Sequence, residues 1–162
     1  MLVDLRSEQE PLRRQALDRF VEAYWKPVYK YVRLRWRKDS PDAEDLTQSC
    51  FTELLEGSFL ARFDAKKASF RTFLRVFVDS NVLQQHESDT RMKRGGGAVV
   101  LSLDFPSAER ELPLTSPAGS PEDIFFREWQ RQIFALALDD LRRWCLETGR
   151  EAQFAVFEAY DL

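Results

Sequence analysis

The sequence predicts an all-α protein, and three observations carry this prediction. Apolar residues recur every three or four positions through most of the chain, which places them on one face of a helix. Two stretches begin with Ser-Pro followed by acidic residues, a typical helix start. Of the 162 residues, 44% are apolar and 31% are charged, which suffices for a packed core and excludes wholesale disorder.

Two helices are expected in the first 38 residues. The first follows a capping box of Ser7 and Glu10, and Pro27 is expected to break or kink it near Trp25-Lys26. The second carries its basic residues on the side opposite its apolar stripe. The first stripe is Leu12, Ala16, Leu17, Phe20, Val21 and Tyr24; the second is Val28, Tyr31, Val32 and Trp36, opposite Lys30, Arg33, Arg35, Arg37 and Lys38.

Two further helices complete a first unit over residues 1–88. One starts with Ser40 as N-cap and Pro41 at its first position, and ends near Gly57. The other is capped by Ser69 and carries the stripe Phe70, Phe73, Leu74, Phe77, Val78 and Asn81. Since Asn81 is polar, it is either a satisfied buried amide or a ligand contact.

The second half of the chain divides into a linker and a helical piece. Helical periodicity is lost over residues 89–119, which are rich in Pro and Gly and predict a linker between domains. Ser120-Pro121 then opens a long helix to about Gly149, and a short helix follows to Tyr160. We therefore expect a four-helix domain at 1–88, a linker at 89–119 and a two-helix piece at 120–162.

Charge is unevenly distributed along the chain. The total is 24 basic against 27 acidic side chains, a formal net charge of −3, which excludes a binder of the histone type. Residues 1–97 carry 18 basic and 15 acidic side chains, whereas residues 98–162 carry 6 and 12. This asymmetry between the two parts is the first indication of function.

Several classes of protein are excluded by missing residue patterns. Cys50 and Cys145 lie far apart in helical patterns and are expected to be buried thiols, so a reducing cytoplasm is the expected compartment. His86 has no partner for a metal site or a catalytic constellation, and no phosphate-binding loop is present. We expect no enzyme activity, no cofactor and no membrane span.

Two motifs resemble a known family. The stretch Asp42-Ala43-Glu44-Asp45-Leu46-Thr47-Gln48, with Phe51 after it, is similar to the acidic helix of extracytoplasmic-function (ECF) sigma factors of bacterial RNA polymerase. Phe70-Arg71-Thr72-Phe73-Leu74, followed by Asn81, resembles the next helix of that family. The segment from Tyr24 to Trp36 and the Ser120-Pro121-Glu122-Asp123 start resemble its first region and the opening of its fourth. No helix-turn-helix follows before Leu162.

The resemblance assigns roles to two sets of residues. It implies that the coiled coil of the polymerase β′ subunit is bound by Asp42, Glu44, Asp45, Gln48 and Glu53. It also implies that unpaired promoter DNA is contacted by Arg62, Phe63, Lys66, Lys67, Arg71, Arg75, Asn81, Arg91, Lys93 and Arg94. From the residues alone, the acids are better explained as partners of the helix dipole and the phenylalanines as core, whereas the basic residues are equally explained as a solvated face or linker.

The resemblance implies a sigma factor that binds core polymerase and melts and recognises the minus-ten promoter element. It also implies that the C-terminal piece can fold back on the first unit, as when an anti-sigma factor holds a sigma factor inactive. The alternative is a sigma-like helical adaptor that engages polymerase or an anti-sigma factor without contacting DNA.

Overall fold

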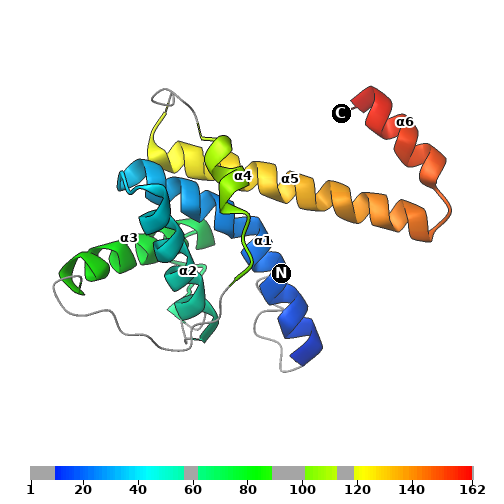
Figure 1. Cartoon of the computed structure of the whole chain (residues 1–162). Coiled ribbons are helices and arrows are strands. Elements are labelled where there is room, and N and C mark those ends of the chain that lie inside the picture. The colour runs from blue at the N-terminus through cyan, green and yellow to red at the C-terminus, as the bar shows by residue number, and fades with distance from the viewer. Residues whose placement is uncertain (1–9, 57–61, 89–100, 113–118, 162) are drawn as a thin grey trace.

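Helices make up nearly all the regular structure of the computed structural model (Figure 1). The structure describes residues 10–56, 62–88, 101–112 and 119–161. These ranges contain no strand, and their helices are α1 (Glu10–Arg35), α2 (Ser40–Glu56), α3 (Phe70–Ser88), α4 (Phe105–Arg110), α5 (Pro121–Glu147) and α6 (Glu151–Asp161). The predicted all-α class is confirmed.

The predicted break at Pro27 is wrong, because α1 continues through this residue. An internal proline costs a helix about 3 kcal/mol. Both halves of α1 pack on the same partner: Tyr24 lies before Pro27 and Tyr31 after it, and both rings contact aromatic side chains of α5. This shared packing offsets the cost. The described residues up to 88 therefore form three α-helices where four were expected.

The starts of α2, α3 and α5 agree with the prediction to within one residue. The cap of α2 is Asp39 and not Ser40, since the Asp39 carboxylate accepts a hydrogen bond of 3.0 Å from the Asp42 N–H. Ser69 caps α3 as predicted, and its hydroxyl accepts from the Thr72 N–H at 3.3 Å. Ser120 and Asp123 form a reciprocal capping box at the start of α5. The expected box of Ser7 and Glu10 lies outside the described residues.

Helix α5 packs antiparallel along α1 (Figure 1). Tyr31 contacts Phe125 with a centroid distance of 5.8 Å, Tyr24 contacts Trp129 at 6.3 Å, and Arg19 pairs with Asp140. Phe125 is 1% exposed and belongs to the same buried cluster as residues of α1, α2 and α3. The long helix predicted for the second piece therefore contributes to the core of the first.

Helix α4 lies within residues that were predicted to form a linker. Asp104 caps it and accepts from the Ser107 N–H, and Phe105 packs its ring on Trp25 at 5.6 Å and Tyr29 at 5.1 Å. The cap, followed by Pro106, is a recognisable helix start. The expectation of a linker is corrected for this stretch, because the Phe105 ring and acidic side chains dock a short helix on α1.

Acidic side chains at the end of α4 attach it to basic side chains of α1. Arg33 forms two hydrogen bonds with Glu109, which lower the pKa of the Glu109 carboxyl. Burial, together with the hydrogen bond to Glu109, raises the pKa of the Tyr29 hydroxyl to about 12. Glu111 accepts from Lys30 at 2.8 Å and from Lys26 at 2.9 Å.

The Glu111 contacts predict a pH dependence of stability. Burial opposes ionisation of Glu111, but hydrogen bonds from Lys30 and Lys26 outweigh it and lower the pKa from 4.5 to about 2. The stabilisation is therefore complete above pH 4.5 and is lost as the pH falls towards 2. Urea unfolding across this window should show wild type losing stability relative to Glu111→Gln. If the difference in free energy of unfolding between wild type and Glu111→Gln stayed constant across this pH range, the prediction would be wrong.

A tight turn joins α5 to α6 and turns the chain back at an angle (Figure 1). Gly149 has a φ of +66°, and the Arg150 N–H donates to the Cys145 carbonyl at 2.7 Å, a Schellman-type helix end. Cys145 and Cys50 are both buried, as predicted, and burial raises the pKa of the Cys50 thiol to about 12.

Candidate functional site

Three acidic side chains form an exposed stripe along α2. Asp42, Asp45 and Glu53 lie on the solvent side of the helix, at spacings of three and eight residues. Asp42 has 62% of its side chain exposed and lies 3.8 Å from Lys38. Exposed carboxylates in this arrangement steer and orient a basic partner surface.

The two other acidic-helix candidates make contacts within the chain. Glu44 accepts a hydrogen bond of 2.8 Å from the Ser40 hydroxyl. The Gln48 amide bonds twice to the backbone of Leu101, donating to its carbonyl at 2.7 Å and accepting from its N–H at 3.1 Å. Gln48 thus holds the segment that leads into α4 against α2.

The loop before α3 presents a cluster of cations. Arg62, Lys66 and Lys67 are exposed. Asp64 shapes the loop, because its carboxylate accepts from the Lys66 N–H at 2.9 Å and its carbonyl accepts from the Lys67 N–H at 3.0 Å. The structure therefore gathers three of the predicted DNA-contacting residues on one short surface loop.

Aromatic rings connect this loop to the core. Phe63 packs on Phe70 at 5.1 Å and on Phe73 at 5.4 Å, so it is half-buried at the base of the loop. Phe70 and Leu74 are buried, as the core interpretation of this stripe predicted. Phe73 and Phe77 are partly buried and pack against the same cluster.

The remaining predicted DNA-contacting residues of α3 face the protein. The guanidinium of Arg71 lies 4.1 Å from the ring centroid of Trp129 and 5.0 Å from that of Phe126, and Arg75 lies 4.0 Å from Glu122. Asn81 is 9% exposed and donates to the Phe77 carbonyl at 3.3 Å, so its amide is satisfied. Arg91, Lys93 and Arg94 lie outside the described residues.

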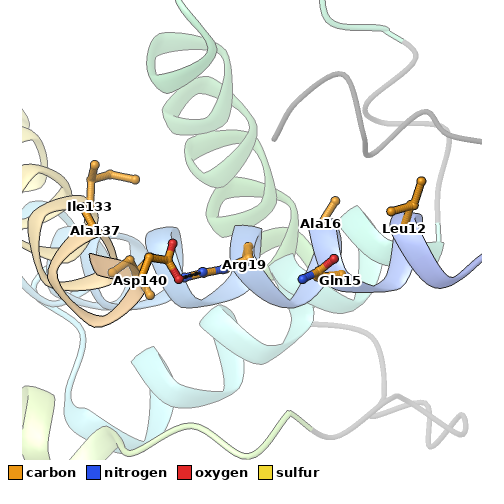
Figure 2. A pocket seen from close by; sticks show the side chains of 8 residues that line it. Leu12, Gln15, Ala16, Arg19, Ile133, Ala137 and Asp140 are labelled. Carbon is orange, nitrogen blue, oxygen red and sulfur yellow. Dashed lines mark hydrogen bonds and ion pairs between the residues drawn. The ribbon is translucent and has the colours of Figure 1, made fainter. Parts of the chain in front are cut away.

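A groove lies between α1 and α5 (Figure 2). It has a volume of about 550 Å³ and is lined by Leu12, Ala16, Ile133, Leu136 and Ala137. The Arg19–Asp140 ion pair lies between the α1 residues Leu12 and Ala16 and the α5 residues Ile133 and Ala137. Apart from that pair its lining carries no group suited to acid–base or nucleophilic chemistry. The described residues contain no cluster placed to hold a metal ion, and none of their helices has the length and apolarity of a membrane span.

Sequence reasoning missed the residues that cover the basic faces of α1 and α3. These are Glu109 and Glu111 at α4 and Phe126 and Glu128 on α5. The Asp104-Phe105-Pro106 start was available as a local signal for α4. Nothing local indicates which face of α5 meets α1 and α3, because that depends on tertiary packing.

The exposed acidic stripe and the exposed basic loop are surfaces of opposite charge on a helical protein. Residues 20–91 match the sigma-70 region 2 family, from within α1 to just beyond α3. This match covers less than half of the chain. It supports the interpretation of the chain as a sigma-70 family member with a role in polymerase binding and promoter recognition. No curated protein and no solved structure matches the chain.

Proposed function

We propose that this protein is an ECF-type sigma factor that acts in the cytoplasm. It binds core polymerase through the acidic stripe of α2 and contacts unpaired minus-ten DNA with the loop of Arg62, Lys66 and Lys67. One observation carries the proposal: the stretch that matches sigma-70 region 2 is the stretch that presents an acidic helix and then a basic loop, both exposed. In this proposal α5 corresponds to the start of region 4, and the partners include an anti-sigma factor.

Reversing the charge of the acidic stripe is expected to weaken polymerase binding strongly. Each reversal at Asp42, Asp45 and Glu53 replaces an attraction by a repulsion. Exposed pairs contribute up to about 1 kcal/mol each, so Lys at all three positions should weaken binding about 100-fold. Pull-down of core polymerase by the tagged full chain measures this loss.

A matched variant controls for net charge. Glu147, Glu151 and Glu158 are exposed at the end of α5 and on α6, and Lys at these three positions changes the charge by the same amount. We expect this control to bind polymerase like wild type. Both variants should keep the helical circular dichroism of wild type. Equal polymerase binding by the stripe variant and wild type would reject the assignment of α2.

A second candidate function is favoured by the contacts of Arg71, Arg75 and Asn81. Because all three are engaged within the chain, an adaptor that binds polymerase without contacting DNA is the competing proposal. Anisotropy of labelled single-stranded DNA with core polymerase separates the two. A sigma factor should lose DNA binding when Lys66 and Lys67 are changed to alanine, whereas an adaptor should show no change.

A further inference from the structure

An exposed aromatic ring lies beside the start of α3, the helix that follows the basic loop, and is not part of the buried core. Phe126 follows the buried Phe125 on α5, but points to another side of the helix and is 40% exposed. Its ring stacks on Trp129 at a centroid distance of 5.9 Å and an interplanar angle of 26°. Large apolar side chains at such a site mark contact surfaces when charged groups surround them.

Arg71 holds this aromatic pair against the start of α3. Its guanidinium lies over both rings, at 4.1 Å from Trp129 and 5.0 Å from Phe126. Such cation–π contacts fix the ring planes while they keep a positive charge beside them. Part of Phe126 remains open to solvent next to a fixed cation.

Continuous ring contacts join this pair to the basic loop. Trp129 contacts Tyr24, Tyr24 contacts Phe70 at 5.6 Å, and Phe70 contacts Phe63 in the loop. These rings lie in the core, but Arg71, whose guanidinium lies over Phe126, follows Lys66 and Lys67 by only five and four residues, so the loop leads directly to this surface. Acidic side chains also lie here: Glu122 is 4.0 Å from Arg75, Asp123 is one turn before Phe126 on α5, and Asp64 stands in the loop.

We propose that Phe126 is a stacking platform for an unpaired base of single-stranded DNA, with the loop cations following the phosphates. This inference rests on the proposed function and extends it to α5, which lies outside the stretch that matches region 2. Single-stranded nucleic acid is bound by this combination, because every base has a π-face and the backbone requires cations.

The test compares two phenylalanines of the same helix. Phe134 is 57% exposed, two turns further along α5, and makes a matched control. In Phe126→Leu the apolar bulk remains but the π-face is lost, so affinity for fluorescein-labelled oligo-dT, measured with core polymerase bound, should fall about 5- to 150-fold. Phe126→Tyr should retain binding, and Phe134→Leu should bind like wild type.

Photocrosslinking distinguishes direct contact with a base from a structural role of Phe126, because only direct contact gives an adduct at this residue. Oligo-dT carrying 5-iodouracil should crosslink to Phe126 in wild type and lose this adduct in Phe126→Leu. If Phe126→Leu and Phe134→Leu bind DNA equally while Lys66→Ala/Lys67→Ala weakens binding, the platform is rejected and the proposed function stands. If wild type with bound polymerase fails to bind the oligonucleotide, both the proposed function and this inference are rejected.

Discussion

Replacing Lys30 by methionine is expected to destabilise the protein by about 3–5 kcal/mol, among the largest effects of any single substitution. The Lys30 ammonium lies 2.8 Å from Glu128 on α5 and 2.8 Å from Glu111 beyond α4. The side chains of Lys30 and Glu128 are 3% and 6% exposed. Methionine fills the same space but leaves two carboxylates facing each other with much of their compensating charge removed.

Urea unfolding of wild type and Lys30→Met measures this loss. Lys30→Met/Glu128→Leu should recover most of the stability, because removing both charges of a buried pair costs far less than removing one. Lys66→Met, on the exposed loop, should change the free energy of unfolding by less than about 0.5 kcal/mol. A double variant no more stable than Lys30→Met would show that the charge pair is not the cause.

Local patterns predicted α2, α3 and α5 and where they start. The apolar stripes that place Phe20 and Leu74 in the core have helical periodicity, and the caps at Ser69 and Ser120 depend on neighbours within three residues. Such signals are visible in sequence because the interacting groups are close along the chain.

Long-range packing explains what the sequence left unpredicted. The helix passes Pro27 because α5 supports both of its halves, and Arg71 turns to α5 because two aromatic rings lie there. The Gln48 amide meets a backbone 53 residues away in the chain. Each contact joins elements that are far apart in sequence, so no local sequence pattern predicts it.

The charge asymmetry of the chain acquires a structural meaning from these contacts. Basic side chains of the first part pair with acidic side chains of the second: Arg19 with Asp140, Lys26 and Lys30 with Glu111, Lys30 with Glu128, Arg33 with Glu109, and Arg75 with Glu122. Much of the basic surplus of residues 1–97 thus holds the C-terminal part in place. The cations of the loop at 62–67 make no such ion pair with the described C-terminal residues, which is why the proposed DNA contact centres there.

Truncation of Phe125 is expected to cause the second large loss of stability. This substitution tests whether residues 120–162 form a unit of their own. Phe125 is 1% exposed and packs edge-on against Tyr31 of α1. Phe125→Ala leaves a cavity between α5 and α1 and should cost about 3–5 kcal/mol. If the core is shared, this loss should lower the stability of α1, α2 and α3 as much as that of α5.

Amide hydrogen exchange resolved by segment distinguishes the two organisations. A shared core predicts that protection in α1 and α5 falls together in Phe125→Ala, and that circular dichroism and tryptophan fluorescence report one common unfolding transition. Phe134→Ala, at a side chain 57% exposed, should leave both helices protected. Loss of protection confined to α5 and α6, with α1 unchanged, would instead support the separate C-terminal piece that the sequence predicts, because an independent unit does not transmit the loss of Phe125 to the helix it rests on.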